Sequence, residues 1–131
     1  MRTYLDTSAL AKLVVREKES PALRRYLKQI RSDTLFTAAI TRTELARAAR
    51  RADSTLLTKV RDVLDSLDII DLTTTILDAA GILDPPALRS LDALHLVAAQ
   101  RAGGELRAVI TYDARMAEVA QSLSIPVATP A

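Results

Sequence analysis

The hydrophobic positions of this chain alternate between short continuous runs and longer stretches with helical spacing. The short runs predict β-strands at residues 3–5, 35–36, 69–72, 108–111 and 126–128. The run at 108–111 is the clearest, because it is apolar up to its final threonine, as expected of a parallel strand buried on both faces. Strands separated by helices indicate a parallel sheet with right-handed crossovers. We therefore expect an α/β fold in which a small parallel β-sheet is flanked by helices on both faces.

The segments between these strands carry signals for helix starts and stops. Ser20 and Pro21 suit the N-cap and the first helical position, and apolar residues follow at helical spacing. Thr41 is expected to start a helix that reaches about residue 52. A helix that begins at Thr73 is expected to end at Gly81 through a left-handed cap. The other predicted helix starts are residues 7–8, 53–54, 90 and 113. No repeat, low-complexity tract or linker divides the chain, so we expect one domain over residues 1–131.

Composition removes several kinds of chemistry. The 131 residues are 49% hydrophobic and 3% aromatic, with no cysteine and one histidine. Disulfides, thiolate metal sites and a cysteine nucleophile are thereby excluded. No apolar run approaches the ~18 residues that a membrane span needs, and Asp6 and Lys12 interrupt any signal-peptide core. We expect a soluble, cytoplasmic protein with no membrane partner.

Four acidic residues stand where a predicted strand gives way to a helix, or where a helix begins. Asp6 and Asp113 follow predicted strands, whereas Glu44 and Asp92 fall in the first turns of predicted helices. The carboxyl ends of parallel strands meet at one edge of a sheet, so these side chains are expected to gather there. Gathered carboxylates repel one another unless a cation holds them, and Mg²⁺ is the usual partner of oxygen-only ligands. The pattern therefore predicts a metal site.

Each acid also has a purely structural interpretation. Asp6 and Asp113 suit the N-cap position of a helix. Thr41 and Glu44 have the spacing of a capping box, in which the Glu44 carboxylate returns to the N-cap amide. Asp92 in a first turn interacts favourably with the helix dipole, by ~0.3–1 kcal/mol. Caps explain any one of these acids more easily than they explain all four together.

Arginine dominates the basic residues. The chain has 14 Arg and 4 Lys against 16 acids, a net charge of +2. If the four acids are set aside, 18 basic and 12 acidic residues remain, a balance of +6. The planar guanidinium suits phosphate well, so the balance permits a nucleic-acid partner. Arg47 and Arg51 follow Glu44 at helical spacing and could guide phosphates towards the acids. Alternatively, they form a solvated face on which Arg47 pairs with Glu44.

The single histidine, His95, lies three residues after Asp92. It cannot form a zinc site without further histidine or cysteine ligands. A general base is one interpretation of His95, but a packed ring with one hydrogen bond is favoured. Thr111, at the end of a predicted strand, could donate a hydrogen bond to a carboxylate or contact a metal-bound water.

Four segments of the chain together resemble a known family. They are Tyr4–Leu10, Thr41–Leu45, Leu91–Leu96 and Ile110–Asp113. In order and spacing they resemble the PIN-domain ribonucleases, in particular the VapC-type toxins of bacterial toxin–antitoxin pairs. The resemblance extends over essentially the whole chain and implies a PIN-like α/β/α sandwich.

The resemblance also implies a mechanism and partners. It implies that RNA is hydrolysed by a metal-activated water, with Mg²⁺ as the cofactor and Mn²⁺ as a substitute. It implies that the metal-binding and catalytic residues are Asp6, Glu44, Asp92 and Asp113, supported by hydrogen bonds from Thr7 or Ser8 and from Thr111. It further implies a homodimer and a small antitoxin partner. The early helices, around Leu10, Leu13, Val14 and Leu23, are candidates for one of these contact surfaces.

Two other functions remain open at this point. A catalytically silent PIN-like module could bind a protein partner and keep only the fold. An aspartate-based phosphoryl-transfer domain is the other alternative, although a phosphatase of the haloacid-dehalogenase type would need a second aspartate where Ser8 stands.

Overall fold

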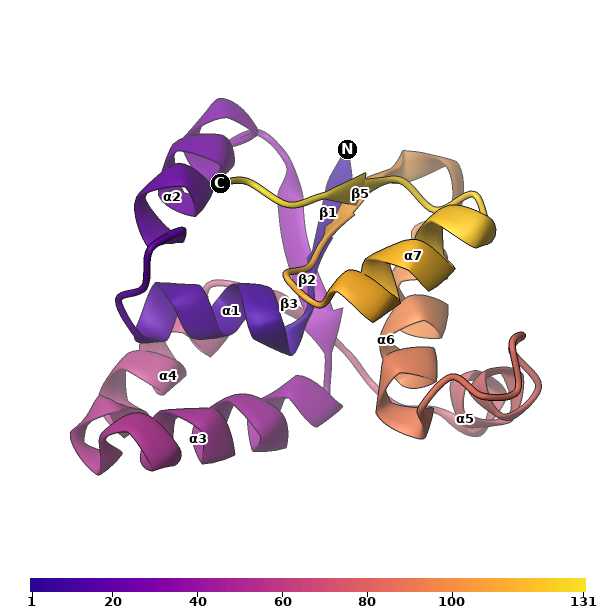
Figure 1. The fold of residues 1–131 in the computed structure, drawn as a ribbon, viewed down its shortest axis with the longest axis horizontal. Coiled ribbons are helices and arrows are strands. Elements are labelled where there is room, and N and C mark those ends of the chain that lie inside the picture. Colours follow the sequence, from indigo (N-terminus) through magenta and orange to yellow (C-terminus); the bar gives the residue numbers. More distant parts are fainter.

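The computed structural model describes residues 1–131 and contains one five-stranded parallel sheet (Figure 1). The order of strands across the sheet is β3-β2-β1-β4-β5, and every neighbouring pair is parallel. The strands are β1 (Arg2–Leu5), β2 (Thr34–Ala38), β3 (Asp68–Ile70), β4 (Leu106–Ile110) and β5 (Val127–Ala128). All five strands expected from the sequence are present, which confirms the predicted α/β fold.

Helices cover both faces of this sheet. They are α1 (Thr7–Val14), α2 (Ser20–Gln29), α3 (Ile40–Ala52), α4 (Leu57–Asp65), α5 (Thr74–Gly81), α6 (Ser90–Gln100) and α7 (Ala114–Ser122), with short 3₁₀ helices at Ser54–Leu56 and Gly103–Glu105. In Figure 1 the helices α1–α4 lie on one side of the sheet and α5–α7 on the other. None of the helices is long and apolar enough to pass through a membrane.

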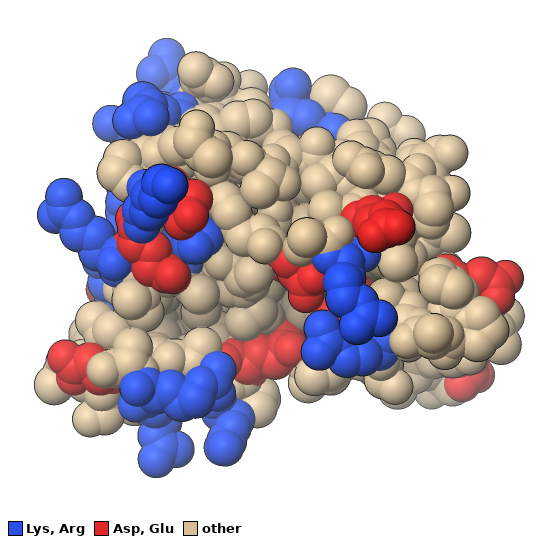
Figure 2. Space-filling view, viewed as in Figure 1, with Lys and Arg blue, Asp and Glu red and all other residues tan.

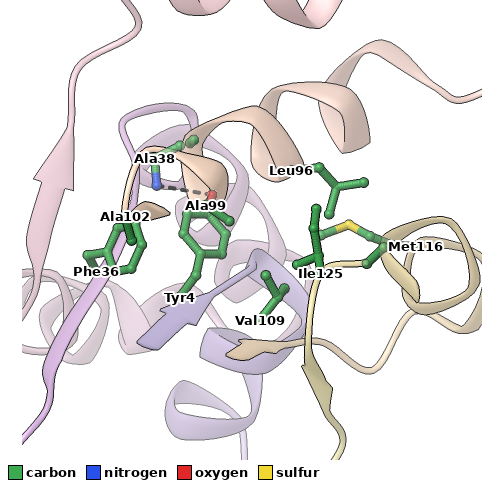
Figure 3. Close-up of a cluster of buried hydrophobic side chains, with 11 residues drawn as sticks. Tyr4, Phe36, Ala38, Leu96, Ala99, Ala102, Val109, Met116 and Ile125 are labelled. Carbon is green, nitrogen blue, oxygen red and sulfur yellow. Dashed lines mark hydrogen bonds between the residues drawn. The ribbon is translucent and has the colours of Figure 1, made fainter. Parts of the chain in front are cut away.

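A separate hydrophobic core lies on each side of the sheet, because successive residues of a strand point to opposite faces. Tyr4 of β1 packs in the core beneath α6 and α7. Its ring meets that of Phe36 edge to face, with 5.1 Å between centroids, and its hydroxyl accepts a hydrogen bond from the Ala38 amide (Figure 3). The next residue, Leu5, packs in the other core with side chains from α1, α3 and α4. Central strand β1 therefore anchors both helical layers.

The early helices are more deeply packed than the sequence suggested. Leu10, Val14 and Leu23 were expected to contribute to a partner surface, but all three are buried in the core beneath α1–α4. Only Leu13 of that group is partly exposed. Leu10, Val14 and Leu23 therefore do not form a contact surface, because their apolar side chains cover the sheet, whereas a surface elsewhere on the early helices stays a prediction.

The predicted capping box at Thr41 is also wrong. Helix α3 begins at Ile40, and its N-cap residue Ala39 provides no side-chain hydrogen bond. The hydroxyl of Thr41 is buried and lies 2.8 Å from the Thr37 hydroxyl instead. Glu44 therefore has no capping role, and its carboxylate is available for other contacts.

Three other predicted helix boundaries differ in detail. Ser20 does not cap α2, because its hydroxyl donates to the Lys12 carbonyl at 2.6 Å and so joins α2 to α1. Ser90 begins α6 without capping it. Gly81 ends α5 as predicted, but not in a left-handed conformation; Gly103 is the glycine with a positive φ, 55°.

A partly buried ion pair joins the strands at their amino ends. The Asp33 carboxylate, which precedes β2, accepts hydrogen bonds from Arg107 at 2.6 and 2.9 Å and from Thr3 at 2.8 Å. The N-terminal amino group lies 3.6 Å away. The hydrogen bonds from Arg107 lower the pKa of Asp33 to about 2, against the effect of its burial. This pair lies at the opposite edge of the sheet from the four acids predicted as a metal site.

Candidate active site

Asp6 occupies the centre of the carboxyl edge of the sheet. It directly follows β1, and its amide donates to the carbonyl of Ile110 in the neighbouring strand β4. The carboxylate is only 3% exposed and accepts hydrogen bonds from the Ala9 amide, the Ser8 hydroxyl and the Thr111 hydroxyl. Burial raises the pKa of Asp6, and these hydrogen bonds oppose the rise without cancelling it. Asp6 therefore caps α1, but it is more deeply desolvated than a cap needs to be.

Glu44 projects from α3 towards α1 and α6. Its Oε1 atom accepts hydrogen bonds from the Thr7 hydroxyl and lies 2.7 Å from Nε2 of His95. Burial alone would raise the pKa of Glu44, but the hydrogen bonds from His95 and Thr7 outweigh it and lower the pKa. Glu44 forms no ion pair with Arg47, so the predicted pairing of these two residues is wrong.

Asp92 and Asp113 both lie beside Arg89, a residue that was not predicted from the sequence to belong to the site. Nε of Arg89 lies 3.5 Å from Oδ2 of Asp92, and its Nη2 lies 3.7 Å from Oδ2 of Asp113. Asp113 also caps α7 through the amides of Arg115 and Met116. Arg89 is three residues before Asp92, a spacing that brings side chains together on a helix. That spacing was the available signal for this contact.

Short hydrogen bonds connect the end of β4 to Asp6. The Thr111 hydroxyl donates to Asp6 and accepts a hydrogen bond from the Asp113 amide at 3.1 Å. The Ser8 hydroxyl accepts from the Tyr112 amide at 2.8 Å. The segments after β1 and β4 are thus held against each other. Figure 2 shows acidic side chains in the middle of this face of the molecule, with basic side chains beside them.

The chemistry of the acids suits a hard divalent cation, although they do not converge tightly. No three carboxylate or imidazole groups lie close enough together to hold one ion jointly. Mg²⁺, however, commonly takes only one or two protein carboxylates and completes its octahedral shell with water. The oxygen-only donor set and the desolvated Asp6 carboxylate fit such an ion.

Arginines from the end of α3 line a separate hollow. Arg47, Arg50, Arg51 and Ser54 surround about 380 Å³ of solvent-accessible space, with no acidic side chain among them. In Figure 2 basic side chains cover the surface of this part of α3. Arg47 and Arg51, the two predicted phosphate contacts, thus line the same hollow as Arg50.

His95 is buried, as the favoured interpretation of this residue predicted, but it forms more hydrogen bonds than expected. One was expected, whereas both ring nitrogens are engaged: Nδ1 lies 2.6 Å from the Tyr4 hydroxyl and Nε2 lies 2.7 Å from Glu44. The contact with Glu44 was not predicted. It connects the core around Tyr4 to the cluster of acids.

The PIN-domain family model matches residues 3–122 of the chain. This chain belongs to the PIN-domain family. Ribonuclease VapC46 of Mycobacterium tuberculosis is 42% identical over 127 residues, which cover 97% of this chain and 96% of that protein. Ribonuclease VapC35 of the same species is 43% identical over 129 residues, with the same shares covered. The resemblance to VapC-type PIN-domain ribonucleases is therefore confirmed, and enzymes of this family generally depend on a divalent metal.

Two solved structures share the fold at low sequence identity. VapBC2 from Rickettsia felis, bound to a DNA fragment from its promoter, gives a TM-score of 0.78 at 15% identity and covers the whole of both chains. VapC20 of Mycobacterium tuberculosis, a toxin that cleaves the sarcin–ricin loop, gives a TM-score of 0.73 at 14% identity over 88% of this chain and 93% of that one. These matches support the α/β/α arrangement of the PIN domain.

Proposed function

We propose that this PIN-domain protein is a cytoplasmic, divalent-metal-dependent endoribonuclease and the toxin of a toxin–antitoxin pair. The observation that carries the proposal is the buried carboxylate of Asp6 at the meeting point of β1 and β4. A desolvated carboxylate with three hydrogen-bond donors is well placed to hold a cation, since the cation would offset the cost of burying its charge. The ribonuclease names of its relatives provide the reaction class.

The four acids would have two roles, which are to bind the ion and to orient the attacking water. Asp6 and Asp92 are proposed to hold Mg²⁺, or Mn²⁺ as a substitute, directly or through water, while Glu44 and Asp113 complete the cluster and orient the attacking water. When bound, the ion lowers the pKa of a water and offsets negative charge on the phosphate oxygens. Thr7, Ser8 and Thr111 hold the carboxylates in place through the hydrogen bonds described above. In-line attack would leave a 5′-phosphate and a 3′-hydroxyl.

Arg47 and Arg51 are proposed to contact RNA phosphates near the acids. Both line the hollow at the end of α3, and both share that helix with Glu44. At 1.5 Å of rise per residue, Arg51 lies about 10 Å along the helix from Glu44. On the order of three nucleotides of a stacked strand span this separation, so the arginines could hold phosphates close to the one that is cleaved.

The proposed partners are an antitoxin and a second copy of this chain. Support for an antitoxin comes from the VapBC2 complex, which shares the fold. The homodimer rests on the family resemblance alone.

A panel of single substitutions tests the proposed site. Asp6→Asn, Glu44→Gln, Asp92→Asn and Asp113→Asn should each reduce Mg²⁺-dependent cleavage of RNA while the circular dichroism spectrum stays unchanged. Asp62→Asn, on the exposed face of α4, is the matched control and should cleave like wild type. If purified Asp6→Asn cleaves RNA as fast as wild type, the metal site is not where we place it. A wild-type protein that binds its antitoxin but never cleaves RNA would instead indicate a silent binding module.

A further inference from the structure

The buried ring of His95 lies between the hydrophobic core and the acid cluster. It is 3% exposed, projects from α6, and contacts Tyr4 of β1 on one side and Glu44 of α3 on the other. The rings of His95 and Tyr4 also meet edge to face, with 5.8 Å between centroids. Its position is therefore fixed by packing as well as by two short hydrogen bonds.

The direction of these hydrogen bonds follows from Glu44, because an ionised carboxylate can only accept. The Ala38 amide donates to the Tyr4 hydroxyl at 3.2 Å, as the dashed line in Figure 3 marks. The hydroxyl has one proton of its own, and His95 Nδ1 is the acceptor that is hydrogen-bonded to it, at 2.6 Å. Because Glu44 can only accept, the ring carries a proton on Nε2, and Nδ1 is left for the contact with the Tyr4 hydroxyl. That proton is donated to Oε1 of Glu44 at 2.7 Å.

This chain of hydrogen bonds leaves one oxygen of Glu44 free. Oε1 accepts from both His95 and Thr7, whereas Oε2 makes no hydrogen bond within the protein. Glu44 is thus held by one oxygen and presents the other to a cation or a water.

We propose that His95 is a positioning residue, which donates from Nε2 to Oε1 of Glu44 while Tyr4 holds the ring, so that Oε2 of Glu44 would be the oxygen left for a cation or its water. This role rests on the proposed function and names a residue outside the four acids. Groups that orient metal ligands in this way typically affect metal affinity or activity by about 10–100-fold when they are removed.

The single histidine makes the tautomer directly measurable. A long-range ¹H–¹⁵N spectrum of the metal-free protein at neutral pH contains one imidazole. We expect its unprotonated nitrogen to be Nδ1, and we expect Tyr4→Phe to change that pattern. A ring with a proton on Nδ1 and none on Nε2 would overturn the proposal. This readout does not depend on metal or on catalysis.

Two amide substitutions separate the two hydrogen bonds of the ring. The amide of His95→Gln can take the place of Nε2 and still donate to Glu44, whereas that of His95→Asn takes the place of Nδ1 and reaches only Tyr4. We expect His95→Asn to lose about 10–100-fold in Mn²⁺ affinity by calorimetry and in cleavage rate, and His95→Gln to lose less than about tenfold. Melting temperatures of the metal-free variants would show whether both remain folded.

Failure of the role given to His95 can be distinguished from failure of the proposed ribonuclease function. Equal losses of Mn²⁺ affinity in His95→Gln and His95→Asn, with both proteins folded, would show that His95 acts only through core packing. If wild type itself neither binds Mn²⁺ nor cleaves RNA, the proposed function fails, and the tautomer measurement still tests the hydrogen-bond chain.

Discussion

Asp6→Asn should leave the metal-free protein at least as stable as wild type, yet abolish its stabilisation by a metal ion. In the metal-free protein the Asp6 carboxylate is buried, and burial raises its pKa above the ordinary value. Each pH unit of that rise costs about 1.4 kcal/mol of folding free energy once the group is ionised. The asparagine amide is neutral and keeps an oxygen for the Ser8 and Ala9 donors, while the Thr111 hydroxyl can turn to accept from its nitrogen. The metal-free variant should therefore melt at or above the temperature of wild type.

The contribution of Asp6 to folding stability should decrease as pH rises. A carboxyl group whose folded pKa is raised holds its proton longer in the folded state, so its contribution to stability is complete below about pH 4 and is lost as pH rises through the folded pKa. As pH rises from about 4 through the folded pKa of Asp6, the free energy of unfolding of metal-free wild type should fall relative to that of Asp6→Asn.

Added metal should reverse the order of the two melting temperatures. At a free Mn²⁺ concentration about 100 times its Kd, binding stabilises the folded state by about 2.7 kcal/mol. For a chain of this length that corresponds to a rise of roughly 8–13 °C. Differential scanning fluorimetry across a Mn²⁺ titration would measure it, with Asp62→Asn as the control. An equal Mn²⁺-dependent rise in wild type and Asp6→Asn would refute the role given to Asp6.

Three further perturbations test other parts of the structure. Asp33→Asn should lose about 1–2 kcal/mol at neutral pH, after allowance for its partly exposed arginine partner. Because the pKa of Asp33 is lowered to about 2, urea unfolding should show this difference shrinking as pH falls from about 4 towards 2; a constant difference would contradict the assignment. Arg89→Gln removes the cation beside Asp92 and Asp113, so the Mn²⁺ concentration for half-maximal binding should fall, and a rise would show that Arg89 assists the metal. Replacing Arg47 and Arg51 together by alanine should lower the salt dependence of RNA binding by a slope of about 1.4, measured by fluorescence anisotropy, whereas an unchanged slope would exclude phosphate contacts.

The strands were predictable from sequence because the sheet is buried on both faces. Val109 fills one core and Ile110 the other, and this continuous apolar pattern located β4 to within about two residues. The pairing β3-β2-β1-β4-β5 was not predicted, since strand order depends on how the helices pack rather than on the composition of any one strand.

The contacts of the site were less predictable than its position. That Asp6 and Asp113 lie at the same edge of the sheet could be predicted, because both follow parallel strands. The partners of Glu44 could not, because its contacts with Thr7 and His95 join three helices that are distant in sequence. Local spacing instead suggested a capping box, and that motif failed because α3 begins at Ile40, one residue before Thr41.

Cleavage of a short RNA by the purified wild-type protein tests the proposed reaction most directly. The protein should be inactive after treatment with EDTA, should regain activity with Mg²⁺ or Mn²⁺, and should leave a 5′-phosphate and a 3′-hydroxyl on the products. Cleavage that persists in EDTA, or that leaves a 2′,3′-cyclic phosphate, would contradict hydrolysis by a metal-activated water at Asp6, Glu44, Asp92 and Asp113.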